Sequence, residues 1–120
     1  MKKILVVFML LFFITGCSAG TYTNVSVDEA KEMIDNGEVE VIDVRTPEEF
    51  AAGHIPDSAL MPLQVIEGML SELDQDKKYL IVCRSGNRSA EASGILAENG
   101  FKNIYNMTGG MNDWKYDIEQ

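Results

Sequence analysis

A cysteine at the start of a short, basic loop is the part of this sequence best suited to chemistry. The segment reads Cys83-Arg84-Ser85-Gly86-Asn87-Arg88-Ser89 and follows an apolar run of strand length. A short loop between a strand and a helix can turn several backbone N–H groups inward, and such a nest at a helix N-terminus binds an anion. A thiolate at Cys83 is stabilised in that setting, so its pKa is expected to fall.

The side chains of this loop add to its preference for negative charge. Arg84 and Arg88 bring two positive charges, and Gly86 permits a backbone angle that a side chain disfavours. Ser89 and its polar neighbours offer further hydrogen-bond donors. We therefore predict Cys83 as a nucleophile that carries an anion. The candidate binding residues are Arg84, Ser85, Gly86, Asn87 and Arg88.

Two kinds of anion suit such a loop. One is a cysteine persulfide, whose outer sulfur is anionic near neutral pH, and the other is a phosphate or arsenate under attack by the thiolate. Cysteine-based phosphatases resemble one another in Cys-x5-Arg, whereas Cys83 and Arg88 form Cys-x4-Arg. A loop one residue tighter fits a single sulfur better than three oxygens, so the spacing favours the persulfide.

The elements around the loop indicate an α/β domain. Capping boxes at Ser26–Glu29 and Thr46–Glu49 predict two helix starts. Helix and strand alternate, which predicts a central, mostly parallel sheet of about five strands with helices on both faces. The expected elements are helix 26–37, strand 39–44, helix 46–53, strand 58–61, helix 63–73, strand 79–83, helix 89–98, strand 101–105 and a short helix around 114.

Two predicted strand ends lie where a site is expected, because open α/β sheets form sites beyond the carboxyl ends of their strands. One is the start of the cysteine loop, and the other is Asp43-Val44-Arg45. We expect Asp43 to support the site structurally, paired with Arg45 or with a loop N–H. Arg45 is a further candidate to line the substrate pocket.

Four short motifs, taken together, resemble the single-domain rhodanese family. They are Asp43-Val44-Arg45, Gly53-His54-Ile55-Pro56, the six-residue loop Cys83–Arg88, and Gly109-Gly110 with Trp114. They occur in the family's order and cover nearly all of the chain from Val25 onward. One departure is Asp57-Ser58, where the family more often has Gly-Ala.

This resemblance implies a rhodanese-type sulfurtransferase with a ping-pong mechanism. The Cys83 thiolate takes the outer sulfur of a donor such as thiosulfate, forms a persulfide, and passes the sulfur to cyanide or a thiol. The loop amides hold the persulfide charge, while Arg84 and Arg88 attract the anionic donor. The alternatives are a noncatalytic persulfide carrier or protein-binding rhodanese module, and a phosphatase or arsenate reductase.

The composition argues against other classes of function. The formal net charge is −9, whereas nucleic-acid binding requires clustered Lys and Arg. His54 is the only histidine, and no second cysteine lies near Cys83, so we expect neither a metal site nor a cofactor. We interpret His54 as a structural residue that holds a turn by hydrogen bonds.

The N-terminus resembles a bacterial lipoprotein leader. Lys2 and Lys3 precede an apolar stretch, Ile4–Ile14, that is too short to span a bilayer as a helix. Ile14-Thr15-Gly16-Cys17 is similar to the lipobox, whose cysteine is lipidated; an ordinary cleaved signal and a retained membrane anchor are the alternatives. The expected organisation is a leader at 1–16, a lipidated tether at 17–23 and a rhodanese-like domain at 24–120, anchored to a membrane of the cell envelope outside the cytoplasm.

Lipidation of Cys17 has a consequence for the loop. It leaves Cys83 as the only free thiol of an exported chain, so no disulfide can form within the chain. A single remaining cysteine in that compartment is expected to be reactive or to pair with another molecule. Together with its neighbours, this favours a reactive role for Cys83.

Overall fold

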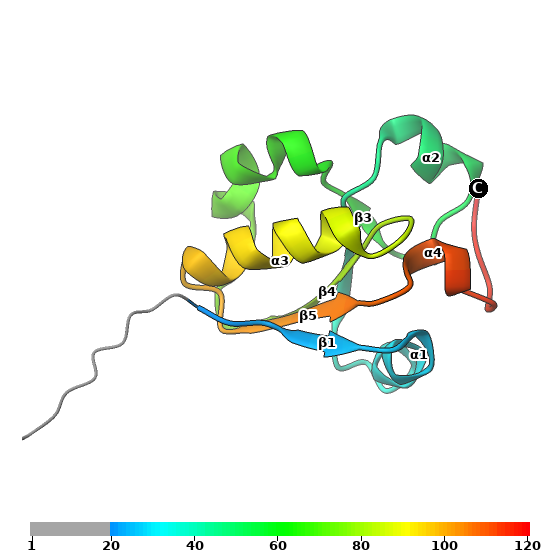
Figure 1. Cartoon of the computed structure of the whole chain (residues 1–120), viewed down its shortest axis with the longest axis horizontal. Helices are drawn as coiled ribbons and strands as arrows, with labels where there is room; N and C mark the ends of the chain where they lie inside the picture. Colours follow the sequence, from blue (N-terminus) through cyan, green and yellow to red (C-terminus); the bar gives the residue numbers. More distant parts are fainter. Residues whose placement is uncertain (1–19) are drawn as a thin grey trace, which may run out of the picture.

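The computed structural model describes residues 20–120, which form an α/β domain around one five-stranded sheet (Figure 1). The strands are β1 (Thr23–Val25), β2 (Glu40–Asp43), β3 (Ala59–Leu60), β4 (Lys78–Val82) and β5 (Asn103–Met107). Their order is β1-β5-β4-β2-β3, and every neighbouring pair is parallel. The predicted α/β class and mostly parallel sheet are confirmed. The predicted leader and lipidated Cys17 lie outside the described residues.

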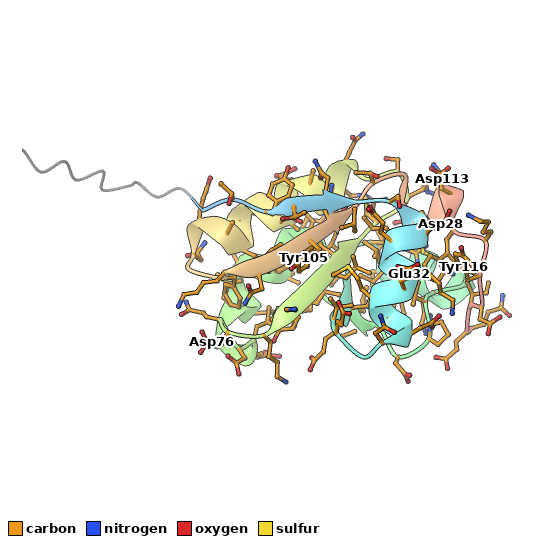
Figure 2. All side chains as sticks on the ribbon, turned by 90° about the horizontal axis from the view of Figure 1, so that it is seen from below. Asp28, Glu32, Asp76, Tyr105, Asp113 and Tyr116 are labelled. Carbon is orange, nitrogen blue, oxygen red and sulfur yellow. The ribbon has the colours of Figure 1, made fainter. Side chains whose placement is uncertain are left out.

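Helices cover both faces of this sheet. They are α1 (Val27–Asp35), α2 (Pro47–Ala52), the 3-10 helix η1 (Leu63–Glu72), α3 (Asn87–Glu98) and α4 (Gly110–Asp113). Side chains of η1 and α3 pack on one face, and those of α1 and the C-terminal segment pack on the other. Figure 2 is a view of this second face, on which both α1 and Tyr105 of β5 lie. Within residues 20–120 no helix is long and apolar enough to cross a membrane.

Strand β4 lies in the middle of the sheet and leads directly into the cysteine loop. Tyr79 and Ile81 join the core under η1 and α3, whereas Leu80 and Val82 join the core under α1. A strand covered on both faces reads as a continuous apolar run rather than an alternating one. The same alternation of side chains places Cys83 on the α3 side of the sheet.

The two predicted capping boxes start α1 and α2. Ser26 accepts a hydrogen bond from the Glu29 N–H at 3.1 Å, and the Glu29 carboxylate accepts one from the Ser26 N–H at 2.8 Å. Thr46 and Glu49 repeat this pattern at 3.2 Å and 3.0 Å. Helix α2 ends at Gly53, as predicted. The second box matters for function because it places Glu49 beside the cysteine loop.

One strand and one helix differ in kind from the sequence-based expectations. Strand β1 was not predicted, since this edge strand reads Thr-Asn-Val and buries only Val25. The helix expected at 63–73 is a 3-10 helix that follows Pro62 without a side-chain cap. Gly68 lies in its middle, and glycine lowers α-helix propensity, which is consistent with the tighter helix.

The start of β5 also differs, because Phe101 lies in the capping turn that follows α3. The Phe101 N–H donates to the Leu96 carbonyl at 3.1 Å, and the Gly100 N–H donates to the Ala97 carbonyl at 3.2 Å. Gly100 has φ +93°, so these bonds form a Schellman motif. Phe101 packs in the same core cluster as Leu96, and the strand therefore begins two residues later than expected.

Candidate active site

The two strand ends singled out in the sequence lie side by side. Asp43 of β2 pairs with Val82 of β4, and the Val44 N–H donates to the Val82 carbonyl at 3.0 Å. The segments that follow, Asp43–Arg45 and the cysteine loop, thus leave the sheet at the same edge. The expectation that the site forms beyond the carboxyl ends of the strands agrees with this register.

The Cys83 sulfur is the acceptor at the centre of its own loop. The Gly86 and Ser89 N–H groups donate to Sγ at 3.1 Å and 3.3 Å, and the Cys83 S–H donates to the Ser89 hydroxyl at 3.4 Å. Gly86 adopts φ +103° as the N-cap of α3, which is the unusual backbone angle predicted for it. Cys83 is only 1% exposed. The loop therefore encloses the sulfur in donors.

These contacts shift the pKa of the Cys83 thiol. Burial raises the pKa of the Cys83 thiol, whereas the Ser89 hydroxyl and the amides of Ser89, Gly86 and Ser85 lower it. The donors outweigh burial, so the pKa lies below its ordinary value. A lowered pKa raises the fraction of nucleophilic thiolate near neutral pH.

Helix α4 holds the opposite side of the loop. The Met111 N–H donates to the Cys83 carbonyl at 2.8 Å, and the Asn112 N–H donates to the Arg84 carbonyl at 2.9 Å. A Cβ at Gly110 would lie 2.4 Å from the Arg84 carbonyl oxygen, so only glycine permits this approach. The loop carbonyls are thereby bound to α4 while its amides face the sulfur.

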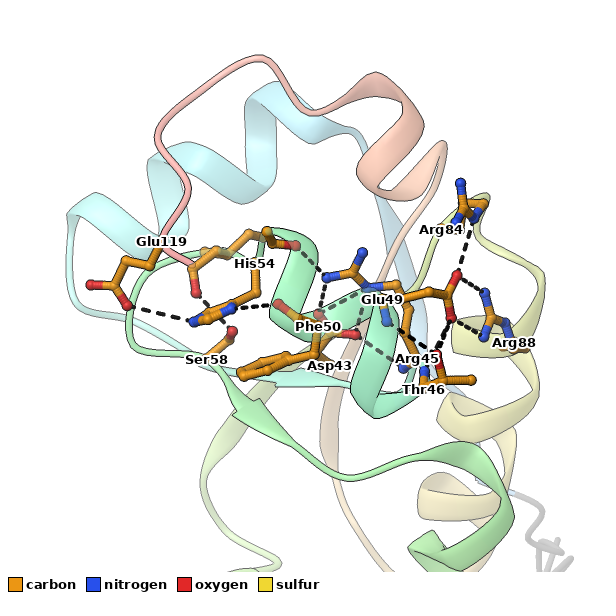
Figure 3. A network of polar contacts seen from close by, with 12 residues as sticks. Asp43, Arg45, Thr46, Glu49, Phe50, His54, Ser58, Arg84, Arg88 and Glu119 are labelled. Atoms are coloured by element: carbon orange, nitrogen blue, oxygen red, sulfur yellow. Dashed lines mark hydrogen bonds and ion pairs between the residues drawn. The ribbon is translucent and has the colours of Figure 1, made fainter.

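Glu49 connects α2 to the arginines of the loop (Figure 3). Its Oε1 accepts a bond from Arg88 Nη1 at 2.8 Å, and its Oε2 accepts bonds from Arg88 Nη2 and Arg84 Nε, both at 3.0 Å. The Glu49 side chain is 16% exposed. Hydrogen bonds from Arg88 outweigh the effect of burial and hold the pKa of the Glu49 carboxyl far below its ordinary range.

This carboxylate changes the electrostatics expected from the sequence. Arg84 and Arg88 were expected to bring two positive charges to the loop, and the structure places one negative charge between them. It also explains how a cation is tolerated at the start of α3, where it opposes the helix dipole. The sequence analysis identified Glu49 only as a capping residue. Its contact with the arginines depends on β2 and β4 being neighbours in the sheet, which local sequence spacing does not reveal.

Asp43 and Arg45 form a buried pair beneath this network. Arg45 donates from Nε and Nη2 to the Asp43 carboxylate at 2.8–3.1 Å, and Nη2 also donates to the Gly53 carbonyl at 2.8 Å. The Asp43 carboxylate accepts the Arg45 N–H as well, at 3.0 Å. Both expected partners of Asp43 are present. Arg45 is buried, and its bonds to Asp43 and Gly53 connect β2 to the C-terminal end of α2. Glu49 lies in the first turn of the same helix.

The remaining candidates lie at or near the loop. Ser85 contributes its backbone amide to the sulfur, and its side chain is exposed. Asn87 is the exposed first residue of α3. His54 holds a turn as expected, with Nδ1 2.8 Å from the Phe50 carbonyl. Within residues 20–120 no three potential metal-ligating acidic, cysteine or histidine residues cluster.

The structure explains how Asp57-Ser58 can replace the Gly-Ala that is more common in the family. Asp57 adopts φ +67°, a left-handed conformation that glycine adopts without strain. The Ser58 hydroxyl, in turn, donates to the Ile55 carbonyl at 2.7 Å. The change from the more common Gly-Ala therefore keeps the turn, and it lies outside the loop that surrounds Cys83.

The parallel sheet and the loop around Cys83 define an α/β domain with a thiol whose anionic form is stabilised by its loop. Residues 26–117 match the family described as the rhodanese-like domain. The chain therefore belongs to the rhodanese-like family, as the four motifs predicted.

Named relatives agree with this assignment. The chain is 33% identical over 94 residues to "Thiosulfate sulfurtransferase GlpE" of Pseudoalteromonas translucida, covering 78% of this chain and 90% of that protein. It is 34% identical over 98 residues to "Putative sulfur carrier protein YrkF" of Bacillus subtilis, covering 81% of this chain and 53% of that longer protein. Among solved structures, a rhodanese-like domain protein of Staphylococcus aureus superposes with a TM-score of 0.75 at 36% identity, over 81% of this chain and 96% of that one.

We predict that Ser89→Ala raises the pKa of the Cys83 thiol, because it removes the hydroxyl that lies 3.4 Å from Sγ and lowers this pKa. Thiol alkylation requires the thiolate, so its rate profile should move to higher pH and the rate at pH 7 should fall several-fold. Stopped-flow alkylation across pH measures this. An unchanged profile would mean that the hydroxyl does not stabilise the thiolate.

We predict that Gly110→Ala separates α4 from the loop and destabilises the domain by about 2–4 kcal/mol through overlap and left-handed strain. Its φ is +58°, and the added Cβ overlaps the Arg84 carbonyl. Gly94→Ala is the matched control, because a Cβ there meets open space in α3 and should stabilise by roughly 0.5–1 kcal/mol. Urea unfolding compares the two, and equal stability would contradict the role given to Gly110.

Proposed function

We propose that this rhodanese-like domain is an enzyme that transfers sulfane sulfur through a persulfide on Cys83. The observation that supports this proposal most strongly is that the backbone N–H groups of Gly86 and Ser89 donate to Sγ at 3.1 Å and 3.3 Å. These donors suit a sulfur that stays anionic throughout the reaction cycle. The similarity to a protein named thiosulfate sulfurtransferase supports the reaction class.

The chemistry proceeds in two displacements. The Cys83 thiolate attacks the outer sulfur of thiosulfate; a new S–S bond forms, the bond to the sulfonate sulfur breaks, and sulfite leaves with that electron pair. Cyanide or a thiolate then attacks the outer sulfur of the persulfide, and the Cys83 thiolate is regenerated. No electron is gained or lost overall, so the cycle needs no cofactor. Splitting one transfer into two is the usual benefit of a covalent intermediate.

The arginines at the loop are proposed to receive the donor. Arg84 is 60% exposed and Arg88 is 34% exposed, so both remain accessible from solvent. Guanidinium groups bind planar pairs of anionic oxygens well. Arg45 is less suited to this task, since its Nε and Nη2 already donate to Asp43 and Gly53. We assign Arg45 and Asp43 the role of holding the site's frame.

A second candidate is a persulfide carrier that gives its sulfur only to a protein partner. The similarity to a protein named as a sulfur carrier favours it, and so does the 1% exposure of Cys83. Carrier and enzyme share the persulfide and differ in turnover with small acceptors. Rapid thiocyanate formation indicates the enzyme, whereas a stable persulfide with negligible turnover indicates the carrier.

We predict that incubation with thiosulfate adds the mass of one sulfur to the protein, and that cyanide removes it as thiocyanate. Cys83→Ser should lose both signals completely, because Cys83 is the only thiol of the loop. Intact mass spectrometry and thiocyanate absorbance provide the two readouts. Thiocyanate production that survives Cys83→Ser would refute the proposal, and release of phosphate from an aryl phosphate would favour the phosphatase alternative.

We further propose that the mature chain begins at an acylated Cys17 and is tethered to a membrane outside the cytoplasm. The support is the leader pattern alone, in which Lys2, Lys3 and Ile4–Ile14 precede the lipobox-like residues. Each buried methylene contributes roughly 0.8 kcal/mol, so two or more acyl chains anchor firmly. Full-length protein made in bacteria should enter the detergent phase, and Cys17→Ser should not. An unmodified N-terminus by mass spectrometry would contradict the anchor.

A further inference from the structure

One carboxylate holds both arginines of the cysteine loop. Glu49 accepts a bidentate pair from Arg88 and a single bond from Arg84 Nε. It also accepts bonds from the Thr46 N–H and hydroxyl at 3.0 Å and 3.1 Å. The carboxylate is therefore fixed from two sides, at the start of the helix and at the loop.

The formal charges at this position cancel. Two guanidinium groups, the Glu49 carboxylate and the Cys83 thiolate carry +2, −1 and −1. Without Glu49 the sum would be +1, which attracts a donor of charge −2 about twice as strongly as a donor of charge −1. With Glu49 the sum is zero, and neither donor gains from it. Glu49 thus removes the advantage that a doubly charged donor would otherwise have.

The two arginines are held unequally. Arg88 uses both terminal nitrogens on Glu49 and is 34% exposed, whereas Arg84 bonds Glu49 through Nε and is 60% exposed. The terminal nitrogens of Arg84 point away from this bond in Figure 3. This leaves the two terminal nitrogens of Arg84 as one guanidinium edge, which can bind one anionic group of a donor.

We propose that Glu49 controls the selection of sulfur donors by charge: compared with a site that lacks it, Glu49 disfavours doubly charged thiosulfate and favours a singly charged organic donor with a terminal sulfane sulfur. Organic persulfides and thiosulfonates belong to this class. This inference rests on the proposed sulfur transfer at Cys83. With a thiosulfonate, the thiolate takes the outer sulfur, the S–S bond of the donor breaks, and a sulfinate leaves with the electron pair.

Glu49→Gln tests this charge effect with the helix start retained, because glutamine also serves in a capping box. Glu29→Gln is the matched control. Glu29 occupies the same capping position in α1, with Ser26 as its partner, and changes the net charge equally. Arg84→Gln is the reciprocal variant, since it removes a positive charge from an exposed side chain.

The measurement compares the rates of Cys83 persulfide formation from thiosulfate and from methanethiosulfonate in each variant. A unit charge at roughly 7 Å in a partly screened site changes binding by about tenfold. Glu49→Gln should therefore shift the rate ratio about tenfold towards thiosulfate, and high salt should reduce that shift. Arg84→Gln should shift the ratio towards methanethiosulfonate, and Glu29→Gln should leave it at the wild-type value.

The outcomes separate the inference from the proposed function. If Glu49→Gln leaves the ratio unchanged, or shifts it away from thiosulfate, Glu49 does not select by charge and the inference is overturned. If wild-type protein forms no persulfide with either donor, the proposed function itself fails. A circular dichroism melt confirms folding for each variant, and Arg84→Gln decides the question if Glu49→Gln does not fold.

Discussion

The site depends on one electrostatic arrangement, in which backbone amides surround a sulfur that lies almost completely out of water. Burial alone disfavours a thiolate, because the low-dielectric interior penalises charge. At Cys83 the N–H groups of Gly86 and Ser89 and the Ser89 hydroxyl reverse that penalty. Because the donors are mostly backbone, the loop's shape matters more than its side chains.

The rest of the fold maintains that shape. Strand β4 ends where β2 ends, which brings the Asp43–Arg45 pair and α2 against the loop. Helix α4 binds the loop carbonyls, at an approach that Gly110 permits. Glu49 then binds the two loop arginines from α2. The parallel strands β2 and β4, helix α4 and helix α2 thus all hold the loop that surrounds Cys83.

Local patterns in the sequence predicted much of this arrangement. The capping boxes, the buried run of β4, the turn at Gly86 and the pairing of Asp43 depend on neighbouring residues and were foreseen. Glu49 was missed as a site residue because its partners lie 35 and 39 positions away. Strand β1 was missed because a polar edge strand forms only through pairing with β5. Contacts that depend on strand order cannot be read from local spacing.

The most direct test of the central interaction is a pH titration followed by the amide resonances of the loop in ¹⁵N-labelled protein. If the amides of Gly86 and Ser89 hold the thiolate, their shifts should change together, with one midpoint below that of an ordinary thiol. Cys83→Ser should abolish the transition. Amide shifts that stay constant while the thiol titrates would contradict the proposed stabilisation.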